Sequence, residues 1–525
     1  MSVGLTEWFY LLPLVLTLGG ALIVGLLGKV LKGRRGDVAL GVVTAVFMFL
    51  ALVSIVNLYY ILMYANWSPL LIWYWPPGPV FDPTTGATCI NIDILAVYMS
   101  VVFVFLGLFV AIYSIKYMEH DDGMGLFYPL LLTLVGSMVG VVYAGDFLTL
   151  FIFWESMSVS SYALVAFRKE ETEPIEAGLK YFLLSAFGST LILFSMSYLY
   201  GLTGTLNLAQ IGANLALLPA GGAWMNIATI TIMGLIIGFG IKAAIAPLCT
   251  WLPDAHPAAP SGISAMLSGV VIMTGSYAIL RLFGYFFSPT VYPVYGYILC
   301  WFALFTMIYG NLMALTQKDI KRLLAYSTIT NVGYIIFGFA VGMMPLTHID
   351  PNAAELARYL SVTGGLFHIT AHMLSKGMLF LCAGVFLHEI GTRDLDKLKG
   401  IGRKMPVTMV CFAIGALSLA GVPPLIGFFS KFFIIWGSIV AGWYLAAAIL
   451  VLSSAFSVVY YLRMIQILVF AEPSPEALKA QRASPVMLFS IVVLTLFIVG
   501  IGLFPEFFLR VAELAAKAAL GLPFS

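Results

Sequence analysis

Long runs of apolar residues, separated by short polar loops, follow one another along almost the whole chain. Each run is close to the roughly twenty residues that an α-helix needs to cross a bilayer. Their approximate bounds are 8–30, 38–63, 94–115, 125–143, 146–167, 174–200, 226–249, 260–285, 291–315, 322–344, 358–387, 406–436, 441–470 and 484–504. The pattern therefore predicts an all-α polytopic membrane protein with about 14 transmembrane helices. The stretch 505–520 is expected to form a short interfacial helix.

The composition agrees with this pattern and narrows the class of protein. Hydrophobic residues make up 61% of the 525 residues and charged residues 10%, whereas soluble proteins carry about 25% charged residues. The net charge of +2 gives no sign of a nucleic-acid partner. The five cysteines are scattered without a CxxC pair, so we interpret them as core residues and not as ligands of a metal or an iron–sulfur cluster. No cofactor and no catalytic redox centre are expected on this chain.

The lysines and arginines of the loops predict the orientation of the helices. Eighteen lie in one set of alternate loops and four in the other, and the positive-inside rule makes the richer set cytoplasmic. The richer set consists of Lys29, Lys32, Arg34, Arg35, Lys116, Arg168, Lys169, Lys318, Lys321, Arg322, Arg393, Lys397, Lys399, Arg403, Lys404, Arg463, Lys479 and Arg482. The opposite set consists of Arg281, Arg358, Arg510 and Lys517. We therefore expect a multi-pass protein of the cell (plasma) membrane with both termini on the extracytoplasmic side.

Four lysines belong to neither set of loops, and one carboxylate lies well inside a predicted helix; these five residues are Glu155, Lys180, Lys242, Lys376 and Lys431. An ionisable residue in a transmembrane helix costs on the order of 3 kcal/mol to insert, so each of them is a candidate functional residue. The alternative is that a lysine extends its ammonium group to the membrane surface while its methylene stem stays among apolar groups. This alternative carries most weight for Lys180, near the start of its helix, and least for Lys376 in mid-helix.

A buried lysine beside a carboxylate can act as a switch of proton affinity. Burial favours the neutral amine, whereas a nearby carboxylate favours the charged ammonium. If such a pair separates, the lysine can pass its proton onward, and Glu155 is the only carboxylate well inside a predicted helix. Sodium needs several oxygen ligands, which lysines do not offer, so this set of residues favours protons over sodium as the transported ion.

Three histidines extend the set of candidates for a proton relay. His368, His372 and Lys376 follow one another at spacings of four residues, which places them on one face of a helix. Their role is a proton relay, structural hydrogen bonding or, since a histidine pair at this spacing can bind zinc, a metal site, although no third zinc ligand is evident. His256 lies in a proline-rich break beside Asp254, where it either ends a proton path or caps the following helix.

Two of the predicted helices contain residues that interrupt a helix. The segment SLAGVPPLIGFFSKFF, which holds Lys431, has two prolines and two glycines, and each proline removes a backbone donor and crowds the preceding turn. Pro247 and Pro253 follow Lys242 in a similar way. Broken membrane helices are tolerated where they line a cavity or lie inside the protein. Two interrupted segments with one lysine each indicate an inverted repeat with two half-channels.

Six segments of the chain carry a specific resemblance, namely FIFWESMSVSSYALVAF, GLKYFLLSAFGS, IKAAIAPLCTWLPDAHPAAPSGISAML, QKDIKRLLAYSTITNVGYIIFG, FHITAHMLSKGMLFLCAG and GVPPLIGFFSKFFI. They closely resemble the antiporter-like proton-translocating subunit family, whose members include the pumping subunits of respiratory complex I, the Mrp cation/proton antiporters and the membrane-bound hydrogenases. The resemblance implies two inverted five-helix units with broken seventh and twelfth helices. It implies four parts, with helices 1–3 in 1–120, the two five-helix repeats in 121–285 and 286–470, and helix 14 with the interfacial segment in 471–525.

The resemblance also implies roles for the charged residues inside the helices. Glu155 on helix five would pair with Lys242 on helix seven. Protons would then pass along a central polar axis to Lys376 on helix eleven and Lys431 on helix twelve. Lys180, on helix six, matches a further lysine that many members carry.

One departure from the family pattern concerns helix eight. Many relatives carry a lysine or a histidine within this helix, where the present chain has Ser268 and Met273. Either water and Lys376 bridge the gap, or the central relay of this subunit is impaired. A polar cavity between Lys242 and Lys376, bounded by Ser268 and His372, is expected in the first case.

The leading hypothesis is a proton-translocating, antiporter-like membrane subunit of a multi-subunit energy-converting complex, either a complex I-like oxidoreductase, a membrane-bound hydrogenase or an Mrp-type antiporter. The chain has no nucleotide-binding motif and no redox ligand, so it would be a non-redox subunit driven by another module. Expected partners are lipid, other membrane subunits including further antiporter-like ones, and a peripheral redox arm. Two alternatives stay open: a structural subunit that lost pumping, and a self-contained secondary carrier for a small anion.

Overall fold

The computed structural model describes residues 7–64, 72–75, 88–218, 223–286 and 294–523. Within these ranges, thirteen helices are long and apolar enough to cross a membrane. A further crossing is made by two shorter apolar helices, α16 (Pro406–Ala420) and α17 (Ile426–Val440), which meet at a break. The prediction of an all-α polytopic membrane protein with about 14 transmembrane helices is therefore confirmed.

The other spanning segments follow the predicted bounds closely. They contain α1 (Leu12–Leu14), α2 (Gly20–Val30), α3 (Gly33–Tyr64), α4 (Ile94–Tyr117), α5 (Met124–Tyr143), α6 (Phe147–Val165), α7 (Thr172–Thr203), α9 (Ala223–Lys242), α11 (Ser261–Met266), α12 (Ile272–Phe286), α13 (Val294–Leu315), α14 (Ile320–Gly342), α15 (Pro351–Ile390), α18 (Tyr444–Ile465) and α20 (Pro485–Leu503). The elements outside the spans are α8 (Leu208–Ala216), α10 (Leu252–Ala258), α19 (Pro475–Lys479), α21 (Glu506–Leu520) and an antiparallel pair of short strands, β1 (Ile72–Trp75) and β2 (Thr88–Asn91).

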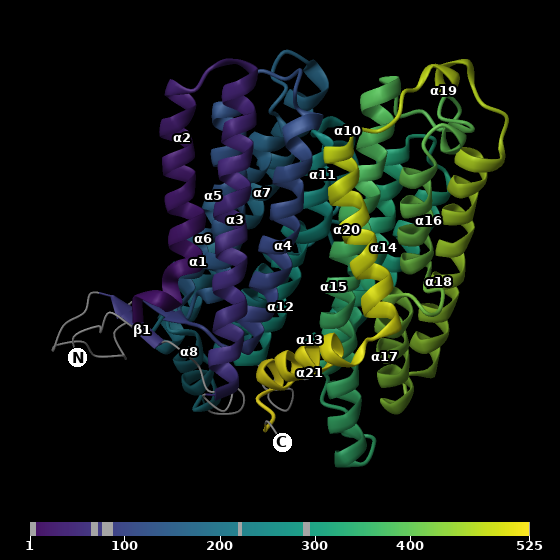
Figure 1. Ribbon diagram of the computed structural model, residues 1–525. Coiled ribbons are helices and arrows are strands. Elements are labelled where there is room, and N and C mark those ends of the chain that lie inside the picture. The colour runs from purple at the N-terminus through teal and green to yellow at the C-terminus, as the bar shows by residue number, and fades with distance from the viewer. Residues whose placement is uncertain (1–6, 65–71, 76–87, 219–222, 287–293, 524–525) are drawn as a thin grey trace.

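The spanning helices run side by side, and α21 lies across their lower ends (Figure 1). This placement agrees with the interfacial helix expected after residue 505. The centre of the bundle is formed by α14 and α15, whose most apolar windows are completely buried. Because α15 packs against α14, α16, α17 and α20, the candidate histidines and lysine that it carries lie in the interior of the protein.

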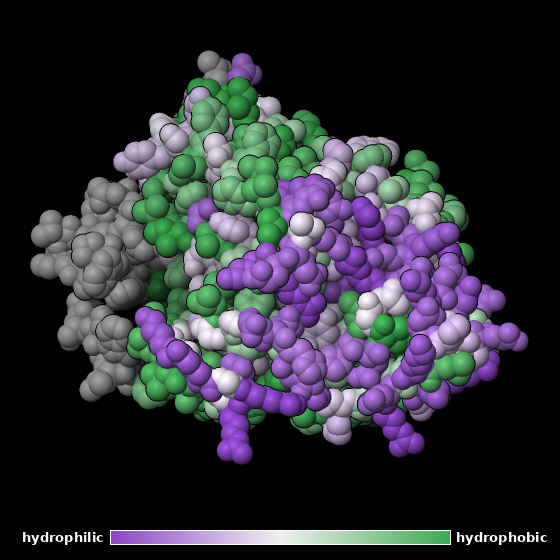
Figure 2. Space-filling model, turned by 90° about the horizontal axis from the view of Figure 1, so that it is seen from above, coloured by the Kyte–Doolittle hydropathy of each residue, from purple (hydrophilic) through white to green (hydrophobic). Residues whose placement is uncertain are grey.

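The periphery of the bundle is apolar, and one end of it is polar. Exposed apolar side chains on the outer helices include Leu22, Leu26, Phe49, Val53, Leu183, Phe187, Phe194, Val451, Phe456 and Leu496. Such faces suit lipid tails or the apolar surface of a neighbouring subunit. Figure 2 shows hydrophilic side chains gathered over much of the upper end. The basic loop between α2 and α3 lies at this end, whereas α1 and α21 lie at the other (Figure 1).

Aspartates begin several of the helices at the edges of the apolar region. Asp93, Asp146, Asp319 and Asp350 precede α4, α6, α14 and α15, and each side chain accepts a hydrogen bond from a backbone N–H of the first helical turn. A cap of this kind stabilises a helix by about 1 kcal/mol because it satisfies a donor that has no partner within the helix.

Arg281 was counted with the basic residues of the outer side. It lies within α12, is buried, and forms an ion pair with Asp93 at the start of α4. Its guanidinium carbon also lies 5.9 Å from the centre of the Tyr277 ring. The predicted span 260–285 already contains this residue, but its burial and its carboxylate partner on α4 depend on the packing of two helices and were not predicted.

Both expected helix breaks are present. α9 ends at Lys242 and the next helix, α10, begins at Leu252, while α16 ends at Ala420 and α17 begins at Ile426. Gly421 follows α16 with a φ of 87°, a left-handed conformation that glycine adopts without strain. That the two halves are inverted repeats, and the division into four parts, stay predictions.

The second break depends on a very close approach of two helix ends. A Cβ atom added to Gly427 would lie 1.9 Å from the backbone carbonyl oxygen of Ser418. We therefore expect Gly427→Ala to lower the thermal unfolding temperature of the detergent-solubilised protein by several degrees, since overpacking of this kind costs about 1–3 kcal/mol. The measurement is a fluorescence-detected thermal melt.

Gly500→Ala in α20 is the matched control, because nothing lies within 4 Å of the added Cβ there. Its melting temperature should equal that of the unaltered protein. Equal melting temperatures for the two variants would show that the break at Gly421 does not depend on this contact.

Candidate functional site

Lys242 closes α9 at the first helix break and is 1% exposed. Its Nζ donates hydrogen bonds to two hydroxyl groups of α6, Ser158 Oγ at 3.0 Å and Ser161 Oγ at 3.3 Å. The same Nζ lies 4.7 Å from the centre of the Tyr181 ring. The ammonium group is therefore held by neutral oxygens and the face of an aromatic ring.

Glu155 lies on α6, one turn before Ser158. Within the described part of the chain it makes no direct ion pair with Lys242, although the two are close enough to interact electrostatically. Its Oε1 atom is buried and has no hydrogen-bond partner among the described residues. Since residues three positions apart share a helix face, the carboxylate and the serine that holds Lys242 are neighbours on α6.

Lys180 is not a buried residue. Its side chain is 50% exposed and its Nζ forms ion pairs with Glu176, at 2.8 Å, and with Asp254, at 3.2 Å. Arg322 pairs with the other oxygen of Asp254 at 2.8 Å. Lys180 thus belongs to a partly exposed network of charges, as the alternative of an ammonium extended to the surface predicts.

Lys376 lies at the middle of α15 and has no exposed surface. Its Nζ donates a hydrogen bond to the backbone oxygen of Leu324 at 2.9 Å and a second one to the hydroxyl of Ser327, both on α14. It also lies 5.8 Å from the centre of the Tyr461 ring. The environment of this ammonium group resembles that of Lys242.

The two histidines on the same face of α15 contact different helices. His372 Nε2 lies 3.1 Å from the backbone oxygen of Ser268. His368 lies between two side chains, with Nδ1 2.8 Å from Ser430 Oγ and Nε2 3.1 Å from Asn331 Oδ1. These contacts give His368 two partners, neither of which is a metal ligand.

A series of contacts leads from Lys376 to the second helix break, through the hydroxyl and the backbone oxygen of Ser327 in turn. Lys376 contacts Ser327, whose backbone oxygen accepts a hydrogen bond from Asn331 Nδ2 at 2.6 Å. Asn331 contacts His368, and His368 contacts Ser430, the residue immediately before the next lysine. Ser327, Asn331 and Ser430 were not among the residues predicted from the sequence to carry protons.

Lys431 lies in α17 and uses the carbonyl groups exposed by the second break. Its Nζ donates hydrogen bonds to the backbone oxygen of Leu419, at 2.6 Å, and to Ser454 Oγ, at 3.1 Å. The Tyr334 ring lies 4.7 Å from the same atom. Leu419 lies in the last turn of α16, where the backbone oxygens lack partners within the helix.

Helix eight has a local irregularity at the position of the missing titratable group. Residues Leu267–Val271 form a π-helical turn, and the Ser268 hydroxyl lies 2.6 Å from Thr328 Oγ1 on α14. Met273 is completely buried. The backbone of Ser268 faces His372, so the serine joins α14 to α15. A polar cavity between Lys242 and Lys376 stays a prediction.

His256 lies in α10 and is completely buried. Its ring stacks on Phe380 at 4.6 Å, and among the described residues neither ring nitrogen has a hydrogen-bond partner. It is close enough to Lys321 and Lys376 to interact electrostatically with both. It does not cap the following helix, because α11 begins after Pro260 without a side-chain cap.

Lys321 is a buried lysine that the sequence analysis placed in a cytoplasmic loop. It lies in the first turn of α14, is 1% exposed, and donates a hydrogen bond to the backbone oxygen of Ala259 at 2.7 Å. It reaches a polar cavity of about 460 Å³ at the end of the bundle. The cavity is also lined by Tyr117, His120, Asp121, Arg168, Glu171, Glu173, Pro257, Ala258, Ala259, Leu387, His388, Gly391, Thr392 and Arg393.

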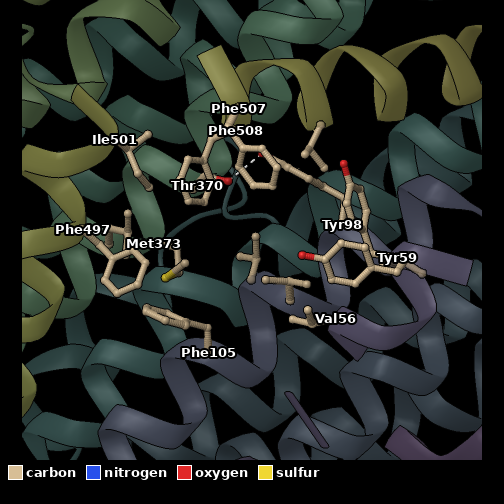
Figure 3. Close-up of a pocket in the computed structure, with 16 residues that line it drawn as sticks. Val56, Tyr59, Tyr98, Phe105, Thr370, Met373, Phe497, Ile501, Phe507 and Phe508 are labelled. Atoms are coloured by element: carbon tan, nitrogen blue, oxygen red, sulfur yellow. Dashed lines mark hydrogen bonds between the residues drawn. The ribbon is translucent and has the colours of Figure 1, made fainter. Parts of the chain in front are cut away.

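An apolar pocket of about 200 Å³ lies apart from these charges, between α3, α4, α15, α20 and α21. Figure 3 shows Phe105, Met373, Phe497 and Phe508 around it. The polar contact drawn there joins the hydroxyl groups of Tyr98 and Thr370, 2.6 Å apart. Lysine, histidine and carboxylate side chains do not line this pocket, so it offers no step for a proton.

Comparisons with known proteins agree on one family. Residues 144–457 match the family described as NADH:quinone oxidoreductase/Mrp antiporter, TM, and residues 87–128 match the N-terminus of chain 5 of NADH-ubiquinone oxidoreductase (complex I). The chain is 33% identical to NADH-quinone oxidoreductase subunit N of Desulforudis audaxviator, over 82% of this chain and 84% of that protein. It is also 33% identical to F(420)H(2) dehydrogenase subunit N of Methanosarcina mazei, over 84% and 86% of the two chains.

A solved structure shows the same fold over almost the whole length. A chain of the membrane-bound sulfane sulfur reductase, an archaeal respiratory membrane complex, has a TM-score of 0.82 and 26% identity, covering 97% of both chains. The similarity therefore extends beyond the region of the family match to almost the whole chain.

The contacts of Lys376 predict a gain in stability when its charge is removed. The ammonium group is completely buried and is held by a carbonyl and a hydroxyl group, which replace only part of its hydration. Lys376→Met keeps the length of the side chain, and we expect it to raise the thermal unfolding temperature in detergent by a few degrees. Lys404→Met, at an exposed position, should leave it unchanged. A lower melting temperature for Lys376→Met would contradict this assignment of the ammonium group as a destabilising one.

Proposed function

Because the chain belongs to the NADH:quinone oxidoreductase/Mrp antiporter transmembrane family, we propose that its buried lysines and histidines carry protons across the membrane. The chain is an antiporter-like membrane subunit of a multi-subunit energy-converting complex, the class to which its relatives belong. The protons follow a route in which each buried lysine and histidine has a separate role.

The observation that carries the proposal is the series of contacts from Lys376 to the neighbour of Lys431. The side chains of this series are buried. The serine hydroxyls and His368 can donate and accept hydrogen bonds, and the lysine ammonium can donate them. Asn331 connects them by donating to the backbone oxygen of Ser327 and contacting His368 through its amide oxygen. Lys376, at one end, and Lys431, next to the other end, are held by neutral oxygens, so no carboxylate retains their protons. Small movements of side chains and water can then pass charge along the interior of α14, α15 and α17.

The first half of the subunit has the components of a proton-affinity switch. Lys242 contacts Ser158 and Ser161, while the carboxylate of Glu155 lies one turn away with one oxygen unbonded. We assign the observed contacts to the separated state of the Glu155–Lys242 pair. Movement of the ammonium group by about one helical turn, roughly 5 Å, would form the ion pair and strengthen the hold on the proton.

Protons enter the central chain from the basic face, through the cavity that reaches Lys321. His256 interacts electrostatically with this lysine and with Lys376, and it immediately precedes Pro257, which lines the same cavity. In this proposal His256 and Lys321 provide the titratable groups that helix eight lacks, since Met273 cannot bind a proton. Lys180 has a different part, since its exposure and its two carboxylate partners place it in the charged surface around Asp254.

The orientation in the membrane follows from the basic loops, which make the polar end shown in Figure 2 cytoplasmic and place both termini outside. The further partners in the proposal are other antiporter-like membrane subunits, lipid and a peripheral redox arm. The chain then contributes proton movement, and the redox chemistry takes place on other subunits.

The relay is tested by Lys376→Met and Asn331→Leu in the intact complex, in inverted membrane vesicles. The measurement is acidification of the vesicle interior, normalised to the turnover of the complex. Lys376→Met should abolish proton movement through this subunit, and Asn331→Leu should reduce it at least tenfold because it removes the link between Ser327 and His368.

Lys404→Met is the control for the loss of an exposed charge, and it should keep the full rate. Full coupled transport in the Lys376→Met complex would favour the structural-subunit alternative. Transport by the purified single chain, without partners, would favour a self-contained carrier.

The orientation is tested by cysteines placed at two exposed positions, Lys32 and Pro523. A membrane-impermeant thiol reagent applied to whole cells should label Pro523→Cys and leave Lys32→Cys unlabelled, because the loop is cytoplasmic and the C-terminal region is not. The unaltered protein gives the background from the native cysteines. Labelling of both positions from the same side would disprove the predicted topology.

A further inference from the structure

Three side chains that can ligate a metal converge where α4 and α15 end on the basic face. The Oε1 atom of Glu119 lies 3.6 Å from His120 Nε2 and 3.9 Å from His388 Nε2. All three atoms lie within 4.8 Å of one another. Glu119 and His120 follow α4, whereas His388 lies in the last turn of α15, so the group is assembled by the tertiary fold.

His388 is oriented as a metal ligand would be. Its Nδ1 lies 2.9 Å from Glu389 Oε1, and a histidine that bonds a carboxylate through one nitrogen directs the lone pair of the other outward. The other nitrogen, Nε2, is buried and has no hydrogen-bond partner among the described residues. The side chain is 16% exposed and its ring lies 6.1 Å from that of Tyr117, so it cannot easily turn away.

The spacing of the three atoms suits a zinc ion. Zinc binds histidine nitrogen and carboxylate oxygen at about 2.0–2.2 Å, which separates tetrahedral ligands by roughly 3.3 Å. The two distances from Glu119 Oε1 are 3.6 and 3.9 Å, and the two histidine nitrogens lie within 4.8 Å of each other, so the three atoms need a closure of at most about 1.5 Å. His120, whose side chain is 79% exposed, is free to make it. Two histidines and one carboxylate leave a fourth position for water, as in other zinc sites with this ligand set.

Two cations share the carboxylate with the proposed ion. Lys116 contacts Glu119 Oε1, and Arg34 contacts Oε2. A carboxylate offers about four lone-pair positions, so these contacts fix the side chain and still leave a position for a metal. They also reduce the negative charge at the site. We therefore expect weaker binding than at a structural zinc site, where several ligands are anionic.

We propose that Glu119, His120 and His388 bind a zinc-class divalent metal ion at the mouth of the cytoplasmic cavity, and that the bound ion slows proton uptake. Both histidines line the cavity that also reaches Lys321. An ion with two positive charges at this mouth opposes the approach of protons. The second part of the proposal rests on the proposed function, whereas metal binding itself does not. His368 and His372 were the histidine pair that the sequence offered for zinc. Among the described residues, this pair has no nearby histidine, cysteine or carboxylate as a third ligand.

Binding is measured on the purified full-length protein with Zn²⁺ by calorimetry, and with Co²⁺ as a spectroscopic probe of tetrahedral coordination. The unaltered protein should bind one ion. His120→Gln and His388→Gln should each weaken binding at least tenfold, and His120→Cys should restore it because a thiolate replaces the imidazole. Glu389→Gln, which removes only the group that orients His388, should weaken binding by about 10–100-fold.

His348→Gln is the matched control, since this histidine bonds the backbone oxygen of Ala441 and lies outside the cluster. It should bind the metal as tightly as the unaltered protein. Unchanged binding in both His120→Gln and His388→Gln would overturn the site. Because His120 is exposed, the result for this variant does not depend on a folding defect.

The effect on transport is measured in the same vesicles as the relay. Micromolar Zn²⁺ should slow proton movement in the unaltered complex and have at least tenfold less effect in His120→Gln. Equal inhibition of the two would overturn the link between this site and proton uptake. Unchanged transport in Lys376→Met would mean that this subunit does not pump. Loss of metal binding in His120→Gln would still establish the metal site in that case, so a failure of the proposed function and a failure of the metal site can be told apart.

Discussion

An ammonium group inside a membrane protein must find its hydrogen-bond acceptors on neighbouring helices, because lipid tails offer none. Four lysines of this chain meet that requirement with backbone and hydroxyl oxygens: Lys242, Lys321, Lys376 and Lys431. These acceptors tie together α6 with α9, α10 and α11 with α14, α14 with α15, and α16 with α17. The broken helices follow from the same requirement, since the interruption after α16 frees the carbonyl group that holds Lys431.

Because the acceptors are neutral, the buried lysines can exchange one hydrogen-bond partner for another while they stay in a polar environment. A buried ion pair fixes its partners, because separating them leaves two charges without compensation. The buried pair of Arg281 and Asp93 lies at the start of α4, in keeping with a structural part. The lysines of the interior, by contrast, are held by neutral oxygens, and three of them also by aromatic rings, so one set of oxygens can replace another at small cost. Permanent ion pairs and exchangeable contacts thus occupy different parts of the same bundle.

Hydropathy and proline positions predicted most of the fold, because length, apolarity and helix interruption are local properties. The spans, both breaks and the burial of Lys242, Lys376 and Lys431 follow from them. Residues near helix ends were harder to place: Lys321, which was assigned to a loop, lies buried in the first turn of α14. Lys180 lies in a charged surface, the alternative that its position near a helix start had left open.

The partners of each charge were not predictable in the same way. Ser327 and Asn331 are four residues apart, so the sequence places them on one helix face. Serine and asparagine occur in many helices that transfer no protons, however, so this spacing did not predict their contacts with Lys376 and His368. Glu119 and His388 are brought together only by the packing of α4 and α15, and nothing in their separate surroundings signals it. Whether Glu155 meets Lys242 depends on the rotamer of a long side chain, which the sequence does not specify.

The length of α15 has a mechanical consequence. Its 40 residues extend about 60 Å, twice the thickness of the hydrocarbon layer, without a break. His368, His372, Lys376 and His388 are therefore mounted on a single rigid rod. A rotation of this helix about its axis would change the contacts of all four groups at the same time. Changes of contact at the centre of the membrane and at its surface would then be coupled.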